Sequence, residues 1–206
     1  SKAILFENIR ESKFKVITNL VGTRKRFAQA VRAKESKIHE KVIWAIKHAR
    51  KPKLVPKGKF MENRSRDISI LPIVKHFAKE PGPFITSSIV YTKNQETGTQ
   101  NSSFHRLLPL DKTHFSIRMV EGRHLYRCFM YAKEHGEDLK VAITVGVHPA
   151  ISIGGAYQAE WGKDELEIAN ALLGHKLTLT KCPYSGLSVP SDTEIVMEGR
   201  ILKDKT

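Results

Sequence analysis

The sequence predicts an α+β fold, with a small N-terminal α/β lobe followed by a larger domain built on a β-barrel. Its 206 residues can bury a sizeable core but are few for two full domains. From Ile68 onward, segments rich in β-branched residues alternate with short helical stretches. The Pro- and Lys-rich segment Lys51–Lys59 precedes this change and is typical of a linker. We therefore place the domains at residues 1–66 and 67–206.

The N-terminal lobe is predicted to contain one strand and two helices. Phe14–Leu20 has the β-branched content of a strand and ends before Gly22. Thr23 can cap a helix that continues through Ala33. A second helix is predicted over Glu35–Arg50. Its apolar stripe comprises Ile38, Val42, Ile43 and Ile46.

The larger domain is predicted to be mainly strands joined by hairpin-like turns. The expected strands are Ile68–Val74, Phe84–Thr92, Phe104–Leu110, Thr113–Val120, Lys140–Val147, Lys176–Lys181 and Glu194–Leu202. The expected helices are His124–His135, Pro149–Tyr157 and Asp164–Leu173. Lys93–Gln100 is a cluster of turn residues between two strands. Asn101 is therefore expected where a strand begins, on a rigid element.

The composition excludes several classes of protein. Hydrophobic residues make up 40% of the chain, but no continuous apolar run approaches the length of a membrane span. No basic-then-apolar leader signals secretion. The two cysteines, Cys128 and Cys182, indicate buried thiols in a reducing compartment rather than a disulfide framework or a zinc site. We therefore expect a cytoplasmic protein.

The net charge of +14 lies entirely in the first third of the chain. Residues 1–66 carry 19 Lys and Arg against five Glu, whereas the remainder carries 16 of each sign. Such clustering can serve nucleic-acid binding. It can equally form a solvated lysine-rich surface or a face for an acidic partner. No recognition helix or aromatic stacking motif accompanies the charge, so we expect no nucleic-acid binding.

Three side chains could together hold a divalent cation. Asn101, His124 and Glu165 offer an amide oxygen, an imidazole and a carboxylate, a mixed set that suits manganese or magnesium. Arginines between and beside them, which suit a phosphate, are Arg106, Arg118 and Arg123. Metal, arginine and phosphate together point to a phosphorylated cofactor and hence to an enzyme.

Each candidate also has an ordinary structural interpretation. Asn101 could be a turn asparagine, and Arg106 could form a surface salt bridge. His124 could be a cap or surface residue at a helix start, where backbone N–H groups favour an anion. Glu165 could simply stabilise the dipole of a helix opened by Asp164.

Strand alternation bears on which of these residues share a site. It places Asn101, Ser103 and His105 on one face, and Ser102, Phe104 and Arg106 on the other. Asn101 and Arg106 should therefore point apart unless a bulge or the strand's twist intervenes.

The order of several motifs resembles the UbiD-type decarboxylases, which use prenylated flavin mononucleotide (prenylated FMN). The resemblance runs from about Ile4 to Gly199. The motifs are GTRKRFAQA, LPI, FITSSIVYTKNQETGTQNSSFHR, VAITVGVHPA, DELEIANALLG and VPSDTEIVMEG. Arg123-His124 and the run DELEIANALLG are most similar to the archaeal branch, which decarboxylates anhydromevalonate phosphate. Six motifs in the family order make coincidence a poor explanation.

The resemblance implies a flavin-reductase-like split β-barrel and a non-oxidative decarboxylase of α,β-unsaturated or aromatic acids. The substrate would be anhydromevalonate phosphate in isoprenoid biosynthesis or a 4-hydroxybenzoate-type acid in quinone biosynthesis. Asn101, His124 and Glu165 would bind Mn²⁺ or Mg²⁺, with K⁺ as a further ion. Arg106 would be catalytic, in an ion-pair network. The flavin would contact Phe104, His105, Arg106, Arg118, Met119, Val120, Arg123 and His124.

The resemblance also implies partners and one departure from the family. A flavin prenyltransferase would supply the cofactor, and the full-length form would be a homo-oligomer. The family's proton-donating acid lies in a PEGPxGD-like segment beyond EIVMEG, and the chain ends at Thr206 before that segment and the C-terminal oligomerisation domain. The isolated 206-residue chain is therefore expected to be inactive. The alternatives are a non-catalytic flavin-binding protein and a nucleic-acid-binding module.

Overall fold

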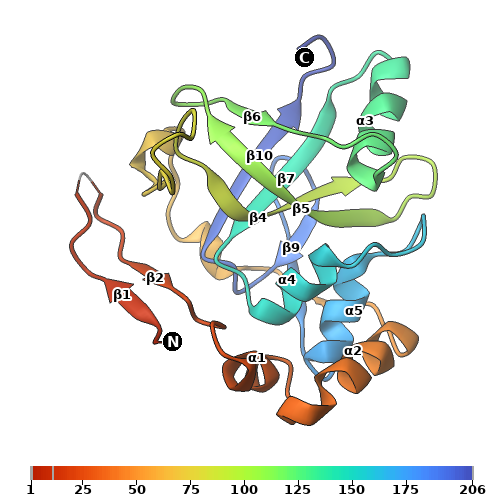
Figure 1. Cartoon of the computed structure of the whole chain (residues 1–206). Helices are drawn as coiled ribbons and strands as arrows, with labels where there is room; N and C mark the ends of the chain where they lie inside the picture. Colours follow the sequence, from red (N-terminus) through yellow and green to blue (C-terminus); the bar gives the residue numbers. More distant parts are fainter. Residues whose placement is uncertain (1, 11, 206) are drawn as a thin grey trace.

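The computed structural model describes residues 2–10 and 12–205, and its centre is a five-stranded antiparallel sheet (Figure 1). The strand order is β10-β7-β4-β5-β6, and the sheet curls into a half-barrel. Its strands are β4 (Ile85–Lys93), β5 (Gln100–Pro109), β6 (Phe115–Ile117), β7 (Leu139–Val145) and β10 (Ile195–Ile201). These five strands match predicted ones, with shifted ends. The fold is thus mixed α/β, as expected.

Helices cover both faces of the sheet because its central strands are apolar on both sides. Helix α3 (His124–Glu134) packs Leu125, Cys128 and Phe129 against one face, over Val90 and Val141. The other face carries α4 (Pro149–Ala156) and α5 (Glu165–Leu172). A second apolar cluster forms there around α5 and the buried faces of β4 and β7. All three helices lie within the predicted ranges.

A small second sheet closes the α5 side of the molecule. It has the order β3-β8-β9, comprising β3 (Lys53–Leu54), β8 (Thr178–Lys181) and β9 (Ser188–Pro190). The segment Lys51–Lys59 was expected to be a linker, but β3 within it pairs in parallel with β8. Because only two residues pair, the segment carries no alternating pattern that would have indicated a strand.

The N-terminal residues form a hairpin and two helices. The hairpin joins β1 (Ile4–Phe6) to β2 (Val16–Thr18) and stands out from the rest of the molecule (Figure 1). Helix α1 (Arg24–Ala30) follows, and the Thr23 side chain accepts from the Arg26 N–H, which confirms the predicted cap. A 3₁₀ turn, η1 (Glu35–Lys37), then leads into α2 (Ile38–Lys47).

Two sequence predictions in these regions are wrong. Ile43 was placed on the apolar stripe of α2 but is 53% exposed, and Ala45 takes the buried position instead. Ile68–Val74 was predicted to be a strand but contains only the 3₁₀ turn η3 (Ile68–Ile70). Asp67 caps this turn by accepting from the Ser69 N–H, and a nearby 3₁₀ turn, η2, spans Lys59–Met61. In this segment, the local hydrogen bond of Asp67 therefore outweighs the strand preference of the β-branched residues.

No helix within residues 2–10 and 12–205 has both the length and the apolar character needed to cross a membrane.

Candidate metal and phosphate site

Asn101 is held at the start of β5 by its pairing and by the turn before it. Asn101 lies opposite Thr92 of β4 and is only 4% exposed. In the preceding turn, the Asn94 side chain accepts from the N–H groups of Glu96 and Thr97. This is an Asx turn, the role expected of a polar turn cluster. Asn101 thus lies near the start of a strand, as predicted.

Glu165 enters the same place from the first turn of α5. Asp164 caps this helix by accepting from the Leu166 N–H, and Glu165 is only 2% exposed. Its Oε1 accepts from Asn101 Nδ2 at 2.9 Å. Its Oε2 accepts from the backbone N–H of Ser102 at 2.8 Å. Both carboxylate oxygens therefore face β5.

His124, the first residue of α3, completes the cluster. Its Nδ1 lies 3.3 Å from Asn101 Nδ2 and 3.6 Å from Glu165 Oε1. Three elements far apart in the sequence thus bring together the three residues proposed as metal ligands. We call Asn101, His124 and Glu165 the polar cluster.

The donor set of the polar cluster fits a divalent cation. Asn101 Oδ1 is buried and has no hydrogen-bond partner in the described structure. The oxygen and nitrogen of an amide differ by a half-turn, so Asn101 can present either atom to its neighbours. Among residues 2–10 and 12–205, no three His, Cys, Asp or Glu side chains group together to hold a metal. A metal site here therefore needs the amide of Asn101.

Burial shifts the ionisation of the polar cluster towards neutral forms. It raises the pKa of Glu165 to about 7, although the Ser102 N–H opposes this shift. It also raises the pKa of the neighbouring Asp164 to about 7. The pKa of His124 is lowered, first by burial and then by Arg127 and Arg123. A buried carboxyl that resists ionisation gains most from a nearby cation, because the cation stabilises its charged form.

The start of α3 is suited to an anion. Arg123 is the N-cap residue, but its side chain makes no capping hydrogen bond to the helix. Its guanidinium instead donates to Gln158 Oε1. The first N–H groups of an α-helix lack intrahelical partners, and the helix dipole favours negative charge beside them. This end of α3 lies at His124, so an anion bound there would be next to the polar cluster.

His105 links β5 to the segment that follows β6. Its Nδ1 donates to the carbonyl oxygen of Arg118 at 3.3 Å, and its Nε2 accepts from Ser103 Oγ at 3.0 Å. Burial lowers the pKa of His105. Arg118 itself is exposed, as are Phe104 and Val120, whereas Met119 is partly buried against the α3 cluster.

Arg106 lies apart from the polar cluster. The register of β4 and β5 slips only between Ile85 and Ser88, so the extra residue belongs to β4. Alternation along β5 therefore continues, and Asn101 and Arg106 leave opposite faces. The exposed guanidinium of Arg106 lies 4.9 Å from the ring of Phe84.

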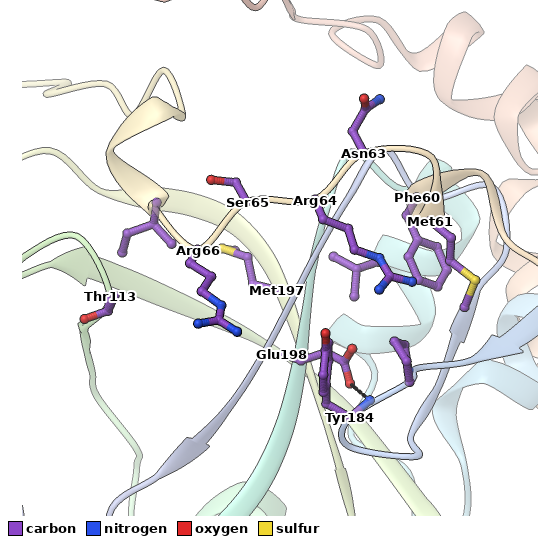
Figure 2. Close-up of a pocket in the computed structure, with 13 residues that line it drawn as sticks. Phe60, Met61, Asn63, Arg64, Ser65, Arg66, Thr113, Tyr184, Met197 and Glu198 are labelled. Carbon is purple, nitrogen blue, oxygen red and sulfur yellow. Dashed lines mark hydrogen bonds between the residues drawn. The ribbon is translucent and has the colours of Figure 1, made fainter.

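A cavity of about 680 Å³ lies elsewhere in the molecule (Figure 2). In Figure 2 the side chains of Arg64 and Arg66 reach towards Met197 and Glu198 of β10. None of the cavity's lining residues belongs to the polar cluster. The Glu198 carboxylate accepts from the N–H groups of Tyr184 and Ser185 and from the Ser185 hydroxyl. Glu198 thus stabilises the β8–β9 turn.

Three residues beside the polar cluster were not singled out from the sequence. They are Glu96, Arg127 and Trp161, which contact one another next to His124. They come from three separate elements, so their spacing in the sequence carries no signal. The clue in the sequence was Trp161, a large aromatic residue in a mainly polar connection.

Two family models match the chain. The model of the 3-octaprenyl-4-hydroxybenzoate carboxy-lyase Rift-related domain, UbiD, matches residues 49–206. The model of the N-terminal domain of the same carboxy-lyase matches residues 1–46. Together they account for nearly all of the chain.

Curated relatives and solved structures agree with these matches. The chain is 31% identical to anhydromevalonate phosphate decarboxylase of Methanothermobacter thermautotrophicus, over 97% of this chain and 47% of that protein. It is 34% identical to the Methanosarcina mazei protein of the same name, over 96% and 46% respectively. It thus spans about half the length of these relatives.

The structural comparison gives the same result. An evolved dimeric form of the UbiD-class enzyme HmfF from Pelotomaculum thermopropionicum, in complex with prFMN, aligns with a TM-score of 0.91. The two are 34% identical, and the alignment covers 97% of this chain and 48% of that one. Together with the family models, this similarity shows that the chain belongs to the UbiD carboxy-lyase family.

Proposed function

We propose that this chain forms the flavin- and metal-binding part of a non-oxidative decarboxylase that uses prenylated FMN. The observation that carries the proposal is the polar cluster, with its partnerless Asn101 Oδ1, beside the uncapped start of α3. A divalent cation held there could bind a phosphate that also meets the N–H groups of α3. The prFMN complex of HmfF supports the choice of cofactor.

Under this proposal, several of the predicted residues would have a role. Asn101, His124 and Glu165 would hold Mn²⁺ or Mg²⁺, and Arg123 would add positive charge beside the phosphate. Arg106 lies five residues further along β5, about 17 Å at strand spacing. The two side chains leave opposite faces of β5, but β6 pairs only with Leu107–Pro109. An extended flavin mononucleotide could therefore pass over the open edge of β5, with its phosphate near Asn101 and its ring near Arg106.

When bound, prenylated FMN would supply the electron-accepting chemistry of decarboxylation. This chain's residues would orient the cofactor and hold the acid beside it. Arg106 stays charged throughout, so it would keep a partner carboxylate in place whichever group carries the proton. Met119 and Val120 would offer apolar contacts to the flavin ring.

The relatives support a choice of substrate class. Two of them, 31% and 34% identical to the chain, are anhydromevalonate phosphate decarboxylases. We therefore propose anhydromevalonate phosphate, in preference to an aromatic acid, as the substrate. A prenyltransferase as cofactor supplier, K⁺ as an additional ion, a cytoplasmic location and a homo-oligomer remain parts of the proposal.

The proposal also includes the finer architecture. The curled sheet would correspond to the split barrel of flavin reductases. Residues 1–66 would form a basic lobe with its linker, and residues 67–206 the flavin-binding unit. One family model ends at residue 46 and the other begins at residue 49, which supports an organisation in two parts.

Binding and turnover test the proposal separately. Calorimetry should show that FMN binds more tightly when Mn²⁺ is present, because the cation offsets the phosphate charge. The native protein, purified with prenylated FMN, should release carbon dioxide from anhydromevalonate phosphate and not from 4-hydroxybenzoate. FMN binding without carbon dioxide release from either acid would favour the non-catalytic alternative. Absence of both FMN and Mn²⁺ binding would overturn the proposal.

A further inference from the structure

The connection between α4 and α5 passes beside His124. We call residues 157–164 the strap. The Arg123 guanidinium donates to Gln158 in the strap. Further along, Gly162 has a φ of +90°, and a Cβ added there would lie 3.3 Å from Thr97 Cγ2. The strap therefore packs closely against the β4–β5 turn at one end and the start of α3 at the other.

Trp161 is the strap's main contact with the polar cluster. Its ring meets the His124 ring edge-on, with centroids 5.1 Å apart and an interplanar angle of 72°. Such T-shaped pairs are favourable and orientation-dependent. Because Asn101 Nδ2 lies 3.3 Å from His124 Nδ1, the imidazole is held between the amide and the indole.

Two charged residues fix Trp161 in turn. The indole N–H donates to Glu96 Oε2 at 3.0 Å. Arg127 donates to the same oxygen at 2.6 Å, and its guanidinium lies 4.0 Å from the Trp161 ring centroid. Each of Glu96, Arg127 and Trp161 thus contacts the other two.

The shared contacts distinguish this group from an ordinary surface ion pair. The side chains of Glu96 and Arg127 are 33% and 53% exposed, so their ion pair alone would contribute little to stability. Here one carboxylate oxygen serves both the guanidinium and the indole, and the guanidinium also covers the indole face. The arrangement orients the Trp161 ring rather than merely joining two charges.

We propose that Trp161, held by Glu96 and Arg127, is a positioning residue for the metal site, which orients the His124 ring and keeps the strap closed beside it. The proposal rests on the proposed role of the polar cluster in metal binding. Residues that orient a metal-binding histidine commonly change metal affinity by about 10- to 100-fold when they are removed.

Mn²⁺ alone serves as the probe, and free Mn²⁺ is measured by electron paramagnetic resonance. Trp161→Ala removes both the ring contact and the hydrogen bond, so Mn²⁺ affinity should fall about tenfold or more. Trp161→Phe keeps a ring beside His124 and should restore part of the affinity. Glu96→Gln keeps an acceptor for the indole but loses the ion pair, so its loss should also be partial. Glu160→Gln is the matched control, because it removes only an exposed ion pair with Lys163 in the same strap.

Fluorescence gives a second readout. The chain has two tryptophans, and Trp44 stacks on His48 in α2. Trp44→Phe leaves Trp161 as the single emitter, and paramagnetic Mn²⁺ should quench it. Trp161→Phe leaves only Trp44, whose emission should not change. Quenching of Trp44 with none of Trp161 would overturn the proposal.

The outcomes separate the two proposals. Equal Mn²⁺ affinity in the wild type, Trp161→Ala, Trp161→Phe and Glu96→Gln overturns the positioning role and leaves the metal site standing. Absence of Mn²⁺ binding by the wild type overturns the metal site. Hydrogen exchange of the metal-free chain then tests whether Trp161 and Glu96 keep the strap closed. Trp161→Ala and Glu96→Gln should speed amide exchange over residues 157–164, and Glu160→Gln should not. Unchanged exchange overturns the strap closure. If Trp161→Ala does not fold, Trp161→Phe and Glu96→Gln provide the same comparison.

Discussion

At the scale of single residues, the amide of Asn101 decides what the polar cluster can do. An aspartate at this position would place a second carboxylate beside Glu165, and burial already disfavours the charge there. The amide offers an oxygen without adding charge. With a neutral imidazole at His124, the polar cluster contributes at most one negative charge, that of Glu165. A divalent cation would then retain positive charge with which to bind a phosphate.

Glu165→Gln should weaken Mn²⁺ and FMN binding together, each by about tenfold or more, because the cation is shared between carboxylate and phosphate. The fold should be retained, since a Gln oxygen can still accept from the Ser102 N–H. Calorimetry with each ligand measures both affinities, and Glu160→Gln serves as an exposed control. An unchanged FMN affinity in Glu165→Gln would show that metal and flavin do not share a site.

Arg106→Ala should leave FMN binding intact and lower carbon dioxide release by the native protein at least about a hundredfold. The exposed guanidinium contacts Phe84 but has no role in the polar cluster, so its loss should not disturb the fold. Arg200→Ala is the control, because Arg200 is an exposed arginine of β10 that pairs with Asp138. Full activity in Arg106→Ala would remove Arg106 from the catalytic assignment.

At the scale of elements, the sequence predicted what has a local cause. Thr23 and Asp164 are cap residues with side-chain acceptors, and both open helices as expected. Asn101 at the start of β5 follows from the turn before it. By contrast, β3 exists only through its pairing with β8, and such tertiary pairing leaves no local pattern. The contacts of Trp161 were hidden for the same reason.

Helix α4 should lose part of its stabilisation in mild acid. His148 Nδ1 accepts from the Ala150 N–H, which a protonated ring cannot do. The pKa of His148 is lowered by burial and then by Arg32, so the neutral form favours folding. Its contribution is therefore full above about pH 6.5, the ordinary histidine value, and is lost as the pH falls through the lower folded-state value.

His148→Asn isolates this effect, because Asn is a good N-cap that does not titrate in this range. The variant should match the wild type at pH 7 in urea denaturation, and lose less stability between pH 7 and pH 5. His148→Ala should lose about 1 kcal/mol at pH 7. Equal pH dependence in His148→Asn and wild type would exclude His148 as the titrating group.

At the scale of the whole molecule, the basic N-terminal part is joined to the larger unit by buried apolar contacts. Val31, after α1, and Ala45 of α2 are fully buried and share a core with Leu172 of α5. Asn170 also donates to the carbonyl oxygens of Arg50 and Lys51. These contacts orient the lobe against α4 and α5. Its position was not predictable from the sequence, because the residues concerned lie more than 100 positions apart.

We expect this basic surface not to bind nucleic acid. Several of its cations already have partners: Lys15 pairs with Glu7, Lys37 with Glu40, and Lys59 with Asp192. Arg26 donates to two backbone carbonyls. The exposed apolar residues of the neighbouring hairpin, Ile4, Leu5, Phe6 and Ile17, are also poor contacts for phosphate.

Electrophoresis with short duplex DNA at physiological ionic strength should therefore show no retarded band up to about 10 µM protein, a concentration at which non-specific DNA-binding proteins bind. A band that appears and is lost on adding salt would overturn this expectation, because release of counterions makes phosphate binding salt-dependent. The double variant Arg24→Glu with Lys25→Glu is the matched test, since it reverses two charges at the exposed start of α1. Loss of the band in that variant would assign nucleic-acid binding to the lobe and revive the nucleic-acid-binding alternative.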